Sequence, residues 1–271
     1  MDDARLRALG DELIAVRGVV AVVLGGSRAR GIHRPDSDYD LGLYYRDDLD
    51  LAGLRACAAC ADAPVEVWPR GGWGPWVDGG AWLTVAGERV DWIYRDLDRV
   101  RRVWDDCRAG RYEVAIQAGH PLGFYSHVYA GEAAICRVLV DPSGELTALQ
   151  AETRRYPAAL GDALVRALWQ AEFALVGARY GAAGDDPAYA AGCLFQLVGV
   201  LCHALHGRAG AWLLNEKAMV AATARLAIAP PGFADDAHAL LAGLGRTRGE
   251  IAATVDRAEA LVARVRAAVD A

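Results

Sequence analysis

The sequence predicts an α+β protein, with an N-terminal mixed sheet and flanking helices followed by an all-helical bundle. Short apolar runs of strand length, separated by turns rich in glycine and proline, occur before residue 95. Strand patterns nearly vanish from about residue 111 onward, where the segments have the spacing or composition of helices. The sheet and the bundle are therefore expected in different parts of the chain.

Length and composition favour a globular protein of two domains. The chain has 271 residues, of which 54% are apolar and 24% are charged, and a single hydrophobic core rarely grows beyond this length. We expect a first domain of residues 1–108 and a helical second domain of residues 109–271.

Charge and hydropathy limit the classes of partner that the protein can have and its expected cellular location. The net charge of −6 gives no basic surface for nucleic acid, which is therefore a disfavoured partner. Residues 1–5 are acidic and begin no apolar signal segment, and we see no uninterrupted apolar segment of spanning length. We expect a cytoplasmic protein with no membrane partner.

The first four elements alternate between helix and strand. Residues 2–17 carry Leu6, Leu9, Leu13 and Val16 on one helical stripe, which predicts an amphipathic helix. Residues 19–24 form a continuous apolar run that fits a strand buried on both faces. A glycine turn follows at residues 25–31, with a helix expected to start at Ser27, and residues 40–45 predict the next strand.

The middle of the chain predicts a helix, a short strand, a loop and a hairpin. The expected ranges are a helix at 50–61, a strand at 64–68, an irregular Trp-rich loop at 69–80, a hairpin of strands 81–85 and 89–94, and a helix at 97–108. Later segments with helical patterns lie near 124–139, 144–154, 158–181, 187–206, 211–227, 234–244 and 247–269. Asp186-Pro187 is a helix-start signal, with Asp at the N-cap and Pro at the first helical position.

The glycine turn and the acidic residues after it predict a site for an anion and a cation. Gly25 and Gly26 let the backbone turn sharply and approach a ligand, and backbone N–H groups at a helix start favour an anion. Alternation along a strand places Asp38 and Asp40 on one face, where two carboxylates repel unless a cation lies between them. Asp91 lies within an apolar strand, where it is paired, bound to a metal or on a solvent face with Arg89 and Ile93.

These residues carry a family resemblance. The order Gly25-Gly26-Ser27, then Asp38-Tyr39-Asp40, then Asp91 resembles the signature of the DNA polymerase β-like nucleotidyltransferase superfamily. Its minimal bacterial members, including aminoglycoside and lincosamide nucleotidyltransferases, often append a helical domain. The resemblance makes residues 1–108 the catalytic domain and residues 109–271 the acceptor-binding domain. Asn215-Glu216-Lys217 is similar to an element of an uncharacterised bacterial family of such enzymes.

The resemblance implies a role for each of these residues. Asp38, Asp40 and Asp91 would hold two Mg²⁺ ions, with Asp91 as an alternative general base. Gly26, Ser27 and Arg28 would bind the triphosphate. Lys217, the only lysine of the chain, would add a phosphate contact from the helical domain.

Several candidates have a structural alternative. Arg28, Arg30 and Lys217 are otherwise surface cations, and Glu132 and Glu172 are either general bases or ordinary ion-paired acids. The tryptophans of the 68–82 region either stack on a ligand or cover the sheet edge and the domain interface. The pair Cys57 and Cys60, and the pair His203 and His206, have metal-site spacing but no further ligands nearby in sequence, so packing is the expected role of both pairs.

The expected activity is Mg²⁺-dependent transfer of a nucleoside monophosphate, AMP from ATP, to a hydroxyl of a small molecule, with release of pyrophosphate. An aminoglycoside-like antibiotic is the leading acceptor, since the net negative charge suits a cationic compound. The alternatives are transfer to a protein or RNA, as in toxin–antitoxin systems, and a nucleotide sensor without turnover. The intact set of three aspartates argues against the sensor.

Overall fold

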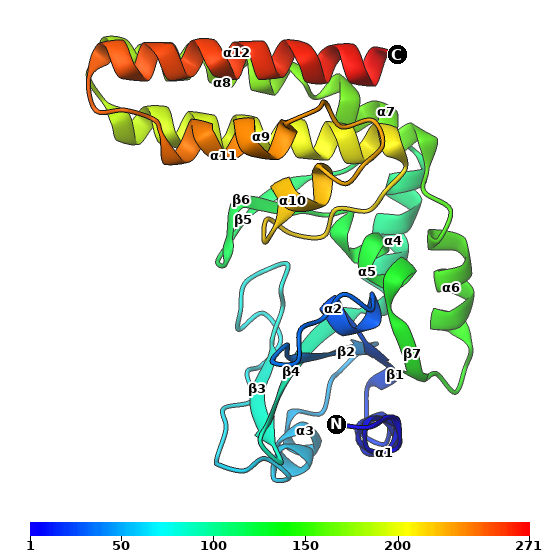
Figure 1. Ribbon diagram of the computed structural model, residues 1–271. Coiled ribbons are helices and arrows are strands. Elements are labelled where there is room, and N and C mark those ends of the chain that lie inside the picture. Colours follow the sequence, from blue (N-terminus) through cyan, green and yellow to red (C-terminus); the bar gives the residue numbers. More distant parts are fainter. The chain divides into compact units, whose positions relative to one another are not determined.

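The computed structural model describes all residues, 1–271, and they form two compact units. The first consists of Met1–Asp106, Tyr112–Gly119 and Gly123–Arg155, and the second of Cys107–Arg111, His120–Leu122 and Tyr156–Ala271. The first unit contains a mixed sheet with helices and the second is almost entirely helical (Figure 1), which confirms the α+β fold class. The functional division at residues 108 and 109 stays a prediction, and the compact units divide the chain differently.

The sheet of the first unit has five strands in the order β3-β4-β2-β1-β7. These are β1 (Val19–Leu24), β2 (Tyr39–Tyr45), β3 (Gly80–Val85), β4 (Glu88–Asp96) and β7 (Arg137–Val140). β2 and β4 pair in parallel, whereas the other neighbours pair antiparallel. The parallel pair places two stretches that are far apart in the sequence at the same level of the sheet.

The helices begun in this part of the chain are α1 (Asp3–Ile14), α2 (Gly26–Ala29), α3 (Leu51–Ala58), α4 (Leu97–Arg108), α5 (Val128–Ile135) and α6 (Glu145–Thr153). α1 packs against β1 and β7, and the predicted stripe of leucines is buried there. Because this burial removes apolar side chains from water, it stabilises the packing of α1 against the sheet. The predicted β1 is also buried along nearly its whole length.

The β3–β4 hairpin is confirmed, but its turn is shorter than expected. Val85 pairs with Glu88, so the turn consists of Ala86 and Gly87, with φ of 53° and 77°. Two positive φ values give the twist that antiparallel strands need across a two-residue turn. The Asp62 carboxylate accepts both backbone N–H groups of the turn at 2.8 Å, which holds this strained geometry in place.

Two predictions in this unit are wrong. The expected strand 64–68 makes only one β-bridge, between Val67 and Ala81, because prolines 64 and 69 lack the N–H groups that a longer ladder needs. The expected helix 124–139 is instead the end of β6 (His120–Tyr125), then α5, then β7. The hairpin of β5 (Val114–Gln117) with β6 was also missed. β5 and β7 have only four residues each, too few to show a strand pattern, and β7 also depends on its distant partner β1.

The second unit is organised around one long helix, α9 (Pro187–Ala209), which contacts each of its other helices. Those are α7 (Ala158–Arg166), α8 (Trp169–Ala183), α10 (Met219–Thr223), α11 (Phe233–Ala242) and α12 (Arg248–Asp270). The predicted start of α9 is confirmed, since the Asp186 side chain accepts from the Tyr189 N–H at 3.0 Å. α7 and α9 approach closely at Gly161, where a Cβ would lie 2.4 Å from the Gly207 carbonyl oxygen. Only glycine allows this approach.

Other expectations for this unit need correction. The expected helix 158–181 is broken between α7 and α8, and the expected helix 211–227 shrinks to the five residues of α10. α9 is long and apolar enough to cross a membrane, contrary to the expectation that no segment is. However, 61% of its most apolar stretch is buried inside the protein.

Candidate active site

Asp40 and Asp91 lie directly opposite each other on the parallel strands β2 and β4. Both side chains are half-buried on one face of the sheet, whereas the neighbouring Tyr39, Leu41 and Trp92 are buried on the other. The alternation of the two strands therefore puts a pair of acids at the same level on an accessible face. The sequence predicted the face of Asp40 and left the environment of Asp91 open, and the structure adds the register that joins them.

The glycine turn packs directly against Asp40. The Gly25 N–H donates to the Asp40 carbonyl oxygen at 2.7 Å. Gly26 has φ of 60°, and a Cβ at this position would lie 1.7 Å from Asp40 Oδ2. Only glycine allows this approach, because any side chain would collide with the carboxylate. The turn, which continues into α2 with the half-buried Ser27, is thus built beside the acid that follows it.

Asp38 lies just before β2 and contacts an arginine of β4. Arg89 Nε is 2.6 Å from Asp38 Oδ1, and Arg89 Nη2 donates to the Asp36 carbonyl oxygen at 2.7 Å. Asp38 Oδ1 is buried and has no hydrogen bond of normal geometry, so its contact with Arg89 is an ion pair with poor alignment. Such an oxygen retains capacity to bind a cation. Sequence analysis placed Arg89 only on a solvent face, although its position two residues before Asp91 put it on the acidic face.

Arg28, predicted to bind nucleotide, contacts its own loop here. Its Nε and Nη2 donate to the Ser37 carbonyl oxygen at 3.0 and 2.7 Å, and Nε also donates to that of Asp38 at 3.2 Å. Its guanidinium lies 3.7 Å from the centre of the Tyr39 ring. Arg28 therefore fixes the backbone on which Asp38 is presented, and its phosphate contact stays a prediction.

The residues of this face fit a hard divalent cation. They offer carboxylate oxygens, the ligands that Mg²⁺ prefers, and Asp38 Oδ1 is a buried oxygen without a hydrogen bond. No group of three or more His, Cys, Asp or Glu side chains is assembled in metal-binding geometry. The protein alone does not preform a complete ligand cage, which is the usual situation for Mg²⁺, since this ion keeps waters and substrate phosphates in its shell.

The family comparison decides the identity of this region. Residues 7–73 match the nucleotidyltransferase domain family. The chain has a nucleotidyltransferase domain. The match includes the glycine turn, Asp38 and Asp40, and it ends before Asp91. It confirms the predicted polymerase β-like superfamily and the predicted enzyme class, a nucleotidyltransferase.

Other comparisons add little detail. No curated protein matches the chain significantly. A solved structure, a nucleotidyltransferase-like protein from Exiguobacterium sibiricum 255-15, is similar with a TM-score of 0.48 and 12% identity. That similarity covers 96% of this chain and 74% of the other.

The Trp-rich loop of the nucleotidyltransferase unit is partly core and partly exposed. Trp76 is buried against Phe124 and Tyr129, whereas Trp73 stacks on the exposed Trp82 with ring centres 4.5 Å apart. Gln117, which sequence reasoning missed, holds the loop: its side-chain oxygen accepts from Trp76 N–H at 3.0 Å and its amide donates to the Trp73 carbonyl. A glutamine in a short exposed strand gives no signal of this contact in the sequence.

The two glutamates predicted as alternative general bases are both ion-paired. Glu132 forms a two-pronged contact with the buried Arg95, at 2.6 and 2.9 Å. Glu172 pairs with Arg266 on the exposed surface of the second unit. Each geometry is the structural alternative weighed for it, and Asp91 remains the acid placed opposite Asp40.

Lys217 lies in the second unit, on an exposed turn before α10. Its neighbour Glu216 is mostly buried, accepts from the Leu122 N–H at 3.2 Å and lies 3.1 Å from His120 Nδ1. Contacts with His120 and backbone N–H groups lower the pKa of Glu216 despite its burial. Glu216 thus anchors the segment that presents Lys217, whose contact with phosphate stays a prediction.

The cysteine and histidine pairs do not form metal centres. Cys57 and Cys60 are free thiols at the end of α3, and burial raises the pKa of both. His203 and His206 are buried in α9, within the core of the second unit. The histidines are thus packed in a core, whereas Cys57 is half-buried and Cys60 is exposed.

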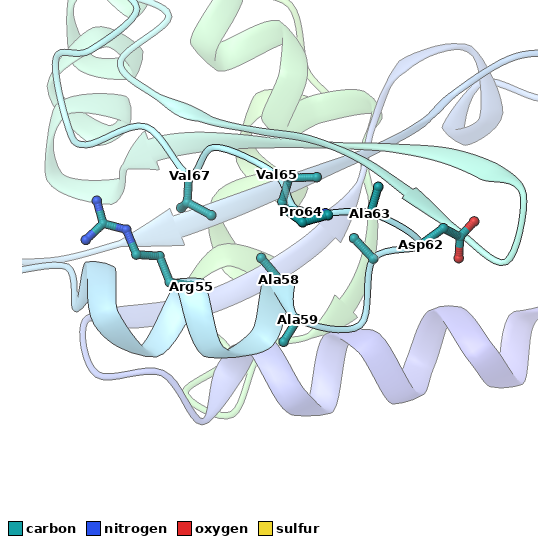
Figure 2. A pocket seen from close by; sticks show the side chains of 9 residues that line it. Arg55, Ala58, Ala59, Asp62, Ala63, Pro64, Val65 and Val67 are labelled. Atoms are coloured by element: carbon teal, nitrogen blue, oxygen red, sulfur yellow. The ribbon is translucent and has the colours of Figure 1, made fainter.

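The nucleotidyltransferase unit also has a hollow of about 400 Å³, away from the glycine turn in the sequence. It is lined by Arg55, Ala58, Ala59, Ala61, Asp62, Ala63, Pro64, Val65 and Val67. Figure 2 shows Arg55 and Asp62 at opposite ends, with small apolar side chains between them. Its two charges do not converge, and Asp62 is already bonded to the hairpin turn, so it is a poorer candidate for a triphosphate than the Gly26 turn.

Proposed function

We propose that the protein is a Mg²⁺-dependent enzyme that transfers AMP from ATP to a hydroxyl group of a small molecule and releases pyrophosphate. One observation carries the proposal: Asp40 and Asp91 lie opposite each other on parallel strands, with the Gly26 turn closed against the Asp40 carboxylate. An anion-binding turn next to paired acids is the chemistry that transfer from a triphosphate requires.

Each residue of the face has a task in this proposal. The backbone N–H groups of Gly26 and the hydroxyl of Ser27 bind the β- and γ-phosphates. Arg28 holds the loop on which Asp38 is presented. Asp91 accepts the proton of the acceptor hydroxyl or serves as a metal ligand. Lys217 lies in the second unit rather than on this face, and its cationic contact to phosphate is proposed from the sequence resemblance alone.

Asp38, Asp40 and Asp91 are the residues that would hold two Mg²⁺ ions, which when bound stabilise the charge of the attacking and leaving oxygens. Without a metal, two carboxylates at one level of a sheet repel each other and any triphosphate nearby. A triphosphate can therefore approach these acids only when a cation compensates their charge.

An aminoglycoside-like antibiotic is the acceptor class that the composition favours. The net charge of −6 attracts a polycationic compound, and exposed Trp82 offers an aromatic face for a sugar or a cation. We place the activity in the cytoplasm, where ATP and Mg²⁺ are available. All six cysteines are free thiols, as expected in a reducing compartment.

The decisive experiment measures pyrophosphate release with Mg²⁺, each nucleoside triphosphate in turn and a panel of aminoglycosides, other hydroxyl compounds, RNA and protein. We expect release with ATP and an aminoglycoside, and modified product by mass spectrometry. Tight triphosphate binding without release for any acceptor would contradict the proposal and indicate a sensor. Release only with RNA or protein would contradict the small-molecule acceptor.

Variants assign the residues in the same assay. Asp38→Asn, Asp40→Asn and Asp91→Asn should each abolish release while leaving the circular dichroism spectrum unchanged. Asp11→Asn on the exposed surface of α1 is the matched control. Lys217→Ala should weaken triphosphate binding more than stability. A wild-type rate in any aspartate variant, or unchanged affinity in Lys217→Ala, would remove that residue from the site.

A further inference from the structure

Helix α8 of the second unit carries an exposed apolar stripe. Trp169, Phe173, Val176 and Tyr180 follow one another at intervals of four, three and four residues. Their exposed fractions are 59%, 71%, 47% and 71%. The opposite face of α8 is buried in the helical core through Ala171, Ala174, Leu175, Ala178 and Ala182. The stripe is therefore a second apolar face, which the fold of this unit leaves uncovered.

The spacing of the stripe is that of a helix–helix seam. Alternating intervals of three and four residues place side chains at the a and d positions of a heptad, where they pack into the facing helix. A single exposed apolar residue is common, but an aligned row of large ones marks an interaction surface. Tyr189 widens the row, since a Cβ at Gly177 of α8 would lie 3.3 Å from its hydroxyl oxygen.

We propose that this stripe is the interface at which two copies of the chain pair through α8. A buried aromatic side chain covers about 150–250 Å². The four exposed aromatics here are Trp169, Phe173, Tyr180 and Tyr189, and together they present on the order of 500 Å² on each copy. Two copies then bury on the order of 1,000 Å² before the rim is counted, which is about the area that a specific interface requires. A single helical stripe matches itself across a two-fold axis.

The rim of the stripe is compatible with self-pairing. On the side of α12, Glu172 is paired with Arg266, and Arg179 with Asp256 and Glu259. These ion pairs compensate all but one of the five charges on this side of the stripe, so two copies bring little like charge together. A mixed polar rim around an apolar centre is the usual anatomy of a protein interface. The net charge of −6 makes an anionic lipid surface a poorer partner than a second copy.

The test is the molecular mass of the full chain in solution, by sedimentation velocity and light scattering over a range of concentrations. The wild type should have twice the mass of the 28.9 kDa chain at micromolar concentration. Phe173→Glu should raise the dimer dissociation constant at least 30-fold with an unchanged melting temperature of the monomer. Ile116→Glu, at an exposed apolar residue of β5, is the matched control and should remain dimeric.

A second measurement does not depend on a disruptive substitution. Val176 lies near the middle of the stripe. It therefore lies near Val176 of the second copy whether the two helices pair parallel or antiparallel. Val176→Cys should form a disulfide-linked dimer under mild oxidation, well above the background from the exposed Cys60 in the wild type. A monomeric wild type, a dimer unaffected by Phe173→Glu, or binding of wild type to lipid vesicles through the same residues in place of dimerisation would overturn the proposal.

Discussion

Arg89 Nε lies 2.6 Å from Asp38 Oδ1, so an arginine of β4 compensates the charge of an aspartate that precedes β2. In the proposed function this aspartate holds a cation, and the arginine and the metal then attract the same carboxylate. Arg89 is mostly exposed and also donates to the Asp36 carbonyl oxygen. It can therefore keep this hydrogen bond when Asp38 binds a cation.

Arg89→Gln should therefore raise the affinity of the nucleotide-free protein for Mn²⁺, a probe for Mg²⁺, about two- to fivefold. The magnitude follows from about 0.5–1 kcal/mol for an exposed ion pair. Free Mn²⁺ is measured by electron paramagnetic resonance. Arg7→Gln, which breaks the exposed pair with Asp11, is the control. An unchanged affinity in Arg89→Gln, or the same change in both variants, would rule out competition.

Gly26→Ala should reduce nucleotidyl transfer at least about 100-fold, because the added Cβ would collide with Asp40 Oδ2. The positive φ alone costs about 1–2 kcal/mol for a residue with a side chain. Gly31→Ala separates the two effects, since Gly31 has φ of 68° but nothing lies within 4 Å of its Cβ position. Pyrophosphate release and chemical unfolding are measured for both. Equal losses of activity in the two variants would mean that strain, rather than the contact with Asp40, is responsible.

Glu132→Gln should lower the free energy of unfolding by on the order of 3 kcal/mol, because it leaves the buried Arg95 guanidinium without its carboxylate. Glu172→Gln breaks an exposed pair with Arg266 and should cost less than about 1 kcal/mol. Denaturant titrations of the two variants measure the difference. If Glu132→Gln instead kept its stability and lost activity with a changed pH profile, Glu132 would be a general base after all.

His206 should make the second unit lose stability as the pH falls below neutrality. Burial lowers the pKa of His206 to about 4, and neither ring nitrogen has a hydrogen bond. The unfolded chain, with a pKa of about 6.5 at this residue, binds a proton first, so stability falls as the pH falls from about 6.5 toward 4.

Between pH 7 and pH 5 the loss attributable to His206 should be about 2 kcal/mol. His206→Leu should remove it, so the wild type should lose that much more unfolding free energy than the variant over this range. His238→Leu, at an exposed position of α11, should behave as the wild type does. Parallel pH profiles for the wild type and His206→Leu would show that His206 is not responsible.

Local signals in the sequence were sufficient for much of this fold. The leucine stripe of α1, the apolar run of β1 and the Asp186 cap of α9 depend on neighbours within a few residues, and all were predicted correctly. β7 was missed because four residues are too few to show a strand pattern, and only its pairing with β1 makes it a strand. The helix expected at 211–227 begins only at Met219, after Ala218 with a left-handed φ of 55°, and ends at Thr223.

The same distinction applies to the site. The glycine turn and the shared face of Asp38 and Asp40 follow from local geometry and were predicted from the sequence, whereas the environment of Asp91 was left open. The register of Asp40 with Asp91, the ion pair of Arg89 and the contacts of Gln117 are set by strands and loops that meet only in the folded chain. The sequence pattern therefore pointed to the acids, whose role stays a prediction, and missed the residues that contact and compensate them.

The parallel pairing of β2 and β4 has a consequence for how such a protein can change. Because hydrogen bonds between the strands set the separation of Asp40 and Asp91, the length of the intervening chain does not. The Trp-rich loop within that connection can lengthen, shorten or exchange residues without moving either acid. Selection can alter the surroundings of the acids while the acids themselves stay in register.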